Sequence, residues 1–216
     1  MIMEYLLKND FTIHYKLPTS TINDITITTS EDYFELEDDN GNIILHTKVG
    51  NGTAKYSNTH QRLMTIINYD KFFTSLSHKF QQGKKRCDLI VYSDDKKYFL
   101  LNELKDGSPR DDVKQGAIKQ LFKSLQIIIS VKSIHEFINE YDIKRCCLFN
   151  KQPETEVSEE INVVTAFNRQ DKIDSSEISI LLPHPDITSL GFEFLAFSGN
   201  QTYLLQDKLL NFPIIL

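Results

Sequence analysis

Residues 87–105, CDLIVYSDDKKYFLLNELK, contain two apolar runs on either side of a polar turn, which is the pattern of a buried β-hairpin. A tight turn over residues 94–97 pairs Asp88 with Glu103 across the two strands. Because side chains alternate between the faces of a sheet, Lys105 lies on the same face as these two acids. The hairpin therefore predicts two carboxylates and an ammonium group at one end of one sheet face.

Two directly opposed carboxylates repel each other, at a cost of about 0.2–1 kcal/mol in a sheet. Carboxylate oxygens suit Mg²⁺ or Mn²⁺, so a divalent cation held by Asp88 and Glu103 is the expected compensation. Lys105 beside such a cation can position a water or stabilise charge on a phosphate. The alternative is a surface ion pair between Lys105 and Glu103 with no function. The apolar character of both strands favours a central hairpin over this alternative.

The segments CDLIVY and LLNELK, followed by the helical pattern QGAIKQL, resemble the PD-(D/E)xK nuclease superfamily, whose fold is restriction-endonuclease-like. The resemblance implies that Asp88 and Glu103 bind catalytic Mg²⁺ and that Leu104 adds its backbone carbonyl. It also implies that Lys105 acts on the attacking water. Cys87 stands where the literal family pattern has proline.

The same resemblance implies two further site residues. Gln120, with Gln115 as the second choice, matches a glutamine that some branches of the family place on the next helix. Asp70 matches an acid that family members often contribute from the first helix. Asp70 also stands where the N-cap of a helix belongs, and capping is an alternative role that can coexist with the first.

Length and composition predict one soluble domain over residues 1–216. The chain is 40% hydrophobic and 25% charged, and it contains no apolar run of the roughly 18 residues that a membrane span needs. We therefore expect no membrane partner. The N-terminus lacks the pattern of a secretory signal, so the expected location is the cytoplasm. The three cysteines are expected to be reduced and buried, and the six histidines show no zinc-binding spacing.

The pattern and the resemblance together predict an α/β (α+β) architecture. A restriction-endonuclease-like core, with a central mixed β-sheet flanked by helices, is expected over residues 61–150. Residues 1–60 form a β-rich N-terminal addition with a hairpin turn at Asn40-Gly41, and residues 151–216 add strands that complete or decorate the core. The expected elements are strands at 24–29, 63–69 and 144–150, a hairpin at 33–47, a loop at 48–60, helices at 70–83, 111–131 and 133–141, and strand-like pieces at 177–182, 191–197 and 202–206.

These observations predict a metal-dependent nuclease that hydrolyses phosphodiester bonds, with DNA preferred over RNA as substrate and with Mg²⁺, or Mn²⁺ in its place. Because the net charge is -6, nucleic acid must bind at a local basic patch. Lys119 and Lys123 on the long helix offer such a patch, although a solvated helix face is the alternative. By analogy of fold, the nuclease belongs to a restriction, repair or anti-phage defence system. The alternative function is a non-catalytic subunit that binds nucleic acid or protein within a larger complex, and either form can be a homodimer.

Overall fold

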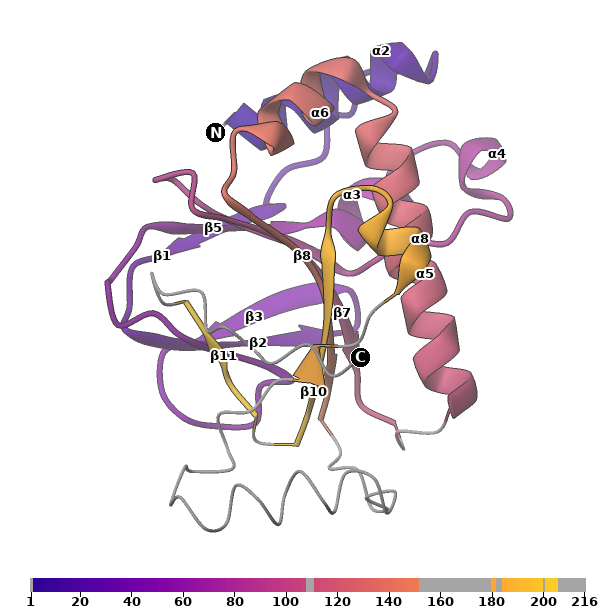
Figure 1. The fold of residues 1–216 in the computed structure, drawn as a ribbon. Coiled ribbons are helices and arrows are strands. Elements are labelled where there is room, and N and C mark those ends of the chain that lie inside the picture. The colour runs from indigo at the N-terminus through magenta and orange to yellow at the C-terminus, as the bar shows by residue number, and fades with distance from the viewer. Residues whose placement is uncertain (1, 108–110, 152–179, 182–183, 200, 206–216) are drawn as a thin grey trace, which may run out of the picture.

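The structure, a computed structural model, describes residues 2–107, 111–151, 180–181, 184–199 and 201–205. The chain folds as a mixed α/β protein in which a mixed β-sheet is flanked by helices (Figure 1). This architecture confirms the α/β class expected from the sequence.

Seven strands of the described chain form the larger sheet, in the order β1-β5-β6-β7-β8-β10-β9. Their bounds are Thr26–Thr29 (β1), Met64–Asn68 (β5), Leu89–Ser93 (β6), Tyr98–Lys105 (β7), Ile143–Asn150 (β8), Ile180–Leu181 (β9) and Glu193–Ser198 (β10). Neighbouring strands from β1 to β7 are antiparallel, whereas β8 pairs in parallel with both β7 and β10. The parallel pair β7–β8 needs a crossover connection, which is helical.

A second sheet has the order β11-β4-β2-β3. Its strands are Tyr33–Asp39 (β2), Asn42–His46 (β3), Ala54–Ser57 (β4) and Tyr203–Leu204 (β11). Strands β2 and β3 form the predicted hairpin, and Asn40 and Gly41 have the positive φ angles, 53° and 83°, that its two-residue turn requires. The expectation of a loop over 48–60 is wrong for residues 54–57, because pairing with β2 and β11 overrides their weak strand preference.

Helices cover one face of the larger sheet (Figure 1). Their bounds are Ile2–Leu6 (α1), Leu7–Phe11 (the π-helical η1), Thr12–His14 (α2), Tyr69–Thr74 (α3), His78–Gln81 (α4), Asp111–Ile129 (α5), Lys132–Asn139 (α6) and Pro185–Thr188 (α8). Helices α5 and α6 confirm the two helices expected after the hairpin. Within the described residues, no helix is both long and apolar enough to cross a membrane.

Two expectations, about the N-terminus and the first helix, are wrong. Residues 2–14 are helical and not β-structure, because Met3, Leu7 and Phe11 recur at helical spacing and are buried against the core. The predicted helix at 70–83 is two short helices, α3 and α4. The C-terminal pieces divide between the sheets, since β9 and β10 extend the larger sheet and β11 joins the second one. Residues 152–179, including most of the acidic segment after β8, lie outside the described residues.

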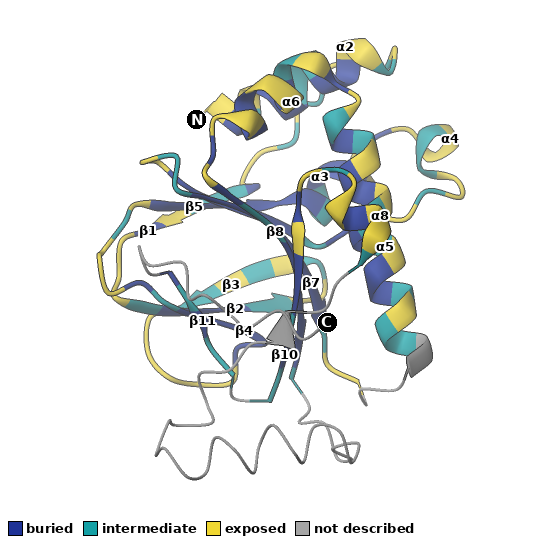
Figure 2. Ribbon diagram, viewed as in Figure 1, coloured by how far each residue is buried: buried dark blue, intermediate teal, exposed yellow. Residues whose placement is uncertain are grey.

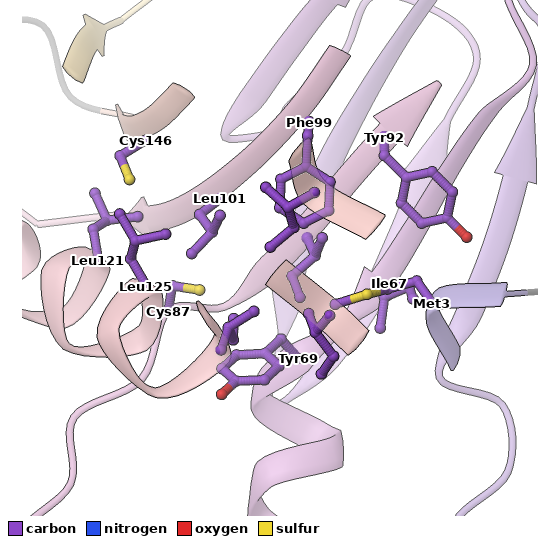
Figure 3. Packing of buried hydrophobic residues seen from close by; sticks show 14 of the residues in the cluster. Met3, Ile67, Tyr69, Cys87, Tyr92, Phe99, Leu101, Leu121, Leu125 and Cys146 are labelled. Carbon is purple, nitrogen blue, oxygen red and sulfur yellow. The ribbon is translucent and has the colours of Figure 1, made fainter. Parts of the chain in front are cut away.

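The core has two layers, one on each face of the larger sheet. On β7, Phe99 and Leu101 pack in the cluster under the helices, whereas Leu100 and Leu104 pack in the cluster beneath the second sheet. Figure 2 shows the buried strands between the two layers, and Figure 3 shows Leu101 near Leu121 of α5 and the buried thiols of Cys87 and Cys146, with Phe99 further toward Tyr92. All three cysteines are free and buried, as predicted. Strand β7 is therefore central and covered on both faces.

A buried acid fixes the loop that follows β3. Glu35 of β2 is fully buried, and its carboxylate accepts hydrogen bonds from Tyr33 Oη at 2.5 Å, Gly50 N at 3.1 Å and Gly52 N at 2.7 Å. These bonds hold the pKa of Glu35 below its usual value although burial alone raises it. The loop therefore folds back over a charged side chain and leads into Thr53, whose hydroxyl reaches Asp106 just beyond β7.

Gly52→Ala tests this packing. A Cβ atom at position 52 would lie 2.3 Å from Glu35 Cβ and 2.8 Å from its carboxylate, so the substitution forces β2 and the loop apart. We expect a loss of about 1–3 kcal/mol in the free energy of unfolding, measured by urea denaturation. The matched control is Gly116→Ala in α5, where a Cβ atom meets nothing within 4 Å and alanine is the better helix former. Equal stability of the two variants would contradict this account of the loop.

Candidate active site

The hairpin β6–β7 has the register expected from its turn. Tyr92 lies opposite Phe99, and the ladder ends where Leu89 pairs with Asn102. The next residue, Asp88, donates its backbone N–H to the Asn102 carbonyl at 3.1 Å. Asp88 and Glu103 therefore occupy corresponding positions at the end of the hairpin, as the sequence predicted.

The carboxylate of Asp88 takes the place of a strand neighbour at the end of β7. Because β6 begins only at Leu89, the backbone N–H of Leu104 has no strand partner on that side, and it donates to Asp88 Oδ2 at 2.6 Å. The Leu104 carbonyl points to the same side as its N–H, since both groups of one residue face one neighbour in a strand. The Asp88 carboxylate and the Leu104 carbonyl thus lie at the same edge.

Helix α3 holds the backbone of Asp88 from the other side. The Asp88 carbonyl accepts hydrogen bonds from the backbone N–H groups of Tyr69 at 2.9 Å and of Asp70 at 3.1 Å. These are first-turn donors of α3, which have no partner within the helix. The start of α3 and the start of β6 are therefore one hydrogen-bonded unit, and Asp70 lies beside Asp88.

Glu103 is a buried carboxylate with only half of its hydrogen-bonding capacity used. Its side chain is 0% exposed, and Oε1 forms an ion pair with Lys105 Nζ. Its other oxygen, Oε2, has no partner among the described residues. A buried acceptor left unpaired costs about 1–3 kcal/mol, and more when it is charged. The Lys105 side chain is 26% exposed, so the pair connects the buried acid to solvent.

Lys105 does not fully offset the cost of ionising the two buried acids. Burial raises the pKa of Glu103 to about 8, with a further contribution from Asp88 that the lysine only partly offsets. Burial also raises the pKa of Asp88 to about 6, against the lowering effect of the Leu104 N–H and of Lys105. Burial lowers the pKa of Lys105, but Glu103, Asp88 and Asp38 outweigh it and the net shift is upward. Lys105 therefore stays protonated, and its charge lowers the pKa values of both acids.

Asp70 lies near the acids, but it is not the helix cap. The N-cap of α3 is Asn68, whose side-chain oxygen accepts the Lys71 N–H at 2.8 Å, so the alternative capping role of Asp70 is wrong. Asp70 instead forms an ion pair with Arg86 Nε. Its negative charge contributes to the raised pKa values of both Asp88 and Glu103.

Gln120 binds the backbone of the segment that leads into Asp88. Its Nε2 donates to the Arg86 carbonyl at 3.1 Å, and Ser124 Oγ, one turn later on α5, accepts from Cys87 N at 2.6 Å. Helix α5 therefore holds two successive residues before Asp88. Gln115, the second choice from the sequence, is exposed.

Arg86 was not singled out from the sequence as a site residue, although it lies two positions before Asp88. Its side chain neutralises Asp70 and its carbonyl binds Gln120, so it joins α3 to α5 behind the acids. The one available signal was the basic run Lys84-Lys85-Arg86, which does not distinguish this residue from its neighbours.

The donors fit a hard divalent cation. Asp88 and Glu103 supply carboxylate oxygens, the Leu104 carbonyl faces the same edge, and Glu103 Oε2 is buried with no partner among the residues that the structure describes. Mg²⁺ commonly binds one or two carboxylates and keeps several waters, so this set is sufficient in kind. Within the described residues, no group of three or more His, Cys, Asp and Glu side chains is arranged to hold a metal ion.

Comparison of the chain with protein-family models, with curated proteins and with solved structures finds no match.

The raised pKa of Glu103 predicts how the stability of the metal-free protein depends on pH. The unfolded chain releases the Glu103 proton near pH 4.5, whereas the folded protein keeps it until about pH 8. Between these values the folded state binds more protons, so its stability falls as pH rises. We expect Glu103→Gln, which cannot ionise, to reduce this fall by about 1 kcal/mol or more, measured by thermal unfolding in EDTA across this pH range.

The matched control for this measurement is Glu140→Gln, which removes an exposed acid paired with Lys96. This variant should follow the parent at every pH. If the stability of Glu103→Gln also falls with pH as steeply as that of the parent, the pKa of Glu103 is not raised in the folded protein.

Proposed function

We propose that the protein is a metal-dependent nuclease of the PD-(D/E)xK type that hydrolyses phosphodiester bonds, with DNA as the expected substrate. The observation that carries the proposal is the buried Oε2 of Glu103, which has no partner in the described part of the chain and lies beside Asp88 and beside a lysine that reaches solvent. A cation and an anionic substrate are the ligands that such a set of charges can accept.

The order of elements supports a restriction-endonuclease-like core. The three antiparallel strands β5, β6 and β7 are followed by α5 and α6 and then by β8, which lies parallel to β7. The two acids and the lysine lie at the end of the central hairpin of this unit. Strand β1 and the C-terminal strands β10 and β9 extend its sheet at the two edges.

Mg²⁺, or Mn²⁺ in its place, would be held by Asp88, Glu103 and the Leu104 carbonyl and would supply Lewis-acid polarisation of the scissile phosphate. Asp88 is already oriented, because its Oδ2 is bound to the Leu104 N–H and its carbonyl to the start of α3. Gln120 holds the chain that precedes it. The protein therefore presents its acidic oxygens without rearranging the strands.

Lys105 supplies a positive charge and hydrogen-bond donors. Its pKa is raised by the surrounding acids, so the ammonium form is kept at neutral pH. An ammonium group can orient a water molecule and stabilise negative charge that develops on a phosphate. In this protein it acts as a donor and not as a general base.

A cleavage assay tests the proposal. Supercoiled plasmid, linear duplex, single-stranded DNA and RNA would each be incubated with Mg²⁺, Mn²⁺ or EDTA. We expect cleavage that needs the cation and falls by about 100-fold or more in Glu103→Gln and in Lys105→Ala. The control is Lys97→Ala at the opposite end of the hairpin, which removes a lysine paired with Asp142 and should cut like the parent.

Cleavage by Lys105→Ala at the parental rate would show that the role given to this lysine is wrong. Nucleic-acid binding without cleavage under either cation would favour a non-catalytic binding subunit. That outcome would leave the acidic site without the hydrolytic role proposed for it.

A further inference from the structure

Two hydrogen bonds hold α5 against the segment that leads into Asp88. Gln120 Nε2 donates to the Arg86 carbonyl at 3.1 Å, and the Cys87 N–H donates to Ser124 Oγ at 2.6 Å. Gln120 and Ser124 are about one helical turn apart, so the segment follows α5 over this turn. Because Asp88 is the next residue of the segment, this contact lies directly beside the acidic site.

Four lysines border the contact, two from each side. Lys84 and Lys85 directly precede the bound residues of the segment, and Lys119 and Lys123 each stand one residue before a bound residue of α5. Lys85, Lys119 and Lys123 are exposed. Lys84 Nζ is held in place, since it donates to the Phe80 carbonyl at 2.6 Å and lies 4.2 Å from the centre of the Phe80 ring. These four lysines are called the lysine strip below.

The charge of the lysine strip is not neutralised within the described part of the chain. Several lysines elsewhere pair with acids, as Lys97 does with Asp142. Among the described residues, no acid forms an ion pair with a lysine of the strip, and the one side chain that any of them binds is the neutral amide of Gln126, which accepts from Lys123 Nζ at 2.9 Å. The strip therefore keeps its positive charge available to a ligand.

The sequence of α5 places like charges together without an acid between them. Lys119 and Lys123 are four residues apart, so they lie on one face of the helix and repel each other at a cost of about 0.2–0.5 kcal/mol. A solvated helix face commonly alternates charges of both signs. Residues 115–127 contain these two lysines and no acid. An anionic ligand would offset the repulsion between them.

An open surface connects the lysine strip with the acids. Helix α5 begins shortly after β7 ends, so its surface leads from Lys119 back toward Lys105. Gly116 lies on this path, and a Cβ atom there would meet nothing within 4 Å. On the other side of the contact, Lys85 is three residues from Asp88, which is at most about 11 Å. A nucleic-acid strand advances about 3.4 Å per phosphate, so the strip lies within about three nucleotides of the acids.

Phosphates of a nucleic-acid backbone are the ligand that such a row of ammonium groups accepts. We propose that the lysine strip binds the phosphodiester backbone of the substrate on one side of the scissile phosphate, through charge and without reading bases. The net charge of -6 does not prevent this, because salt screens exposed charges beyond about 8–10 Å. The inference rests on the proposed function and deepens it, since it assigns the surface along which the substrate lies.

The test compares Lys119→Gln/Lys123→Gln and Lys85→Gln with the control Lys97→Gln/Lys144→Gln. The control removes two positive charges near the start of β7, at the opposite end of the strand from the acids. Fluorescent oligonucleotides of single-stranded DNA, duplex DNA and RNA serve as probes. Their binding is measured in EDTA, which prevents the proposed cleavage, between about 50 and 200 mM salt.

We expect Lys119→Gln/Lys123→Gln to bind about 10-fold or more weakly than the parent and to lower the slope of log K against log salt by about 1–2. Lys85→Gln should lower this slope by about 1, and the control should match the parent. The strip variants should keep the parental unfolding temperature, because the substituted lysines are exposed. With Mg²⁺ they should raise the KM of cleavage and leave kcat close to that of the parent.

Parental binding and salt dependence in both strip variants would overturn the lysine strip and leave the nuclease proposal intact. Binding that weakens in the strip variants, together with no cleavage by the parent under Mg²⁺ or Mn²⁺, would support the strip and overturn the nuclease. A parent that binds none of the three oligonucleotides and cuts none of them would overturn both.

Discussion

Strand β7 carries a carboxylate, Glu103, into the interior at the point where its antiparallel neighbour ends. The strand is covered on both faces, so the charge cannot reach water, and Lys105 balances only one oxygen of it. The opposing Asp88 adds a second negative charge at the same position. This arrangement does not serve the stability of the sheet, because apolar side chains of similar volume in place of a buried ion pair often leave a protein as stable or more stable. The surrounding structure is best understood as support for these two acids.

Each neighbouring element holds a different part of the site. Helix α5 binds the chain before Asp88 through Gln120 and Ser124, and the first turn of α3 binds the Asp88 carbonyl. The second sheet approaches from the other face, and its Thr53 hydroxyl binds Asp106 just beyond β7. The acids are therefore positioned by backbone hydrogen bonds and helix termini, which are stiffer than surface side chains. Rigid positioning of this kind holds groups of like charge close together before a ligand binds.

The local part of this arrangement was predictable from the sequence, because a tight turn and a period of two fix which residues meet across a hairpin. That reasoning placed Asp88 opposite Glu103, and the ladder confirms it. The N-terminal helix was missed although its apolar residues recur at helical spacing. Arg86 was not predictable as a site residue, because its role depends on contacts with segments distant in the chain. Propensity and pattern carry no information on how two sheets pack.

The central claim is that the end of β7 is a cation site, and the most direct measurement is the anomalous scattering of Mn²⁺ in crystals of the protein. The account predicts a manganese ion in direct contact with the Asp88 and Glu103 carboxylates, with Glu103 Oε2 among its ligands and Lys105 still beside the acids. Manganese bound only elsewhere, with Glu103 still unpartnered and buried, would contradict it.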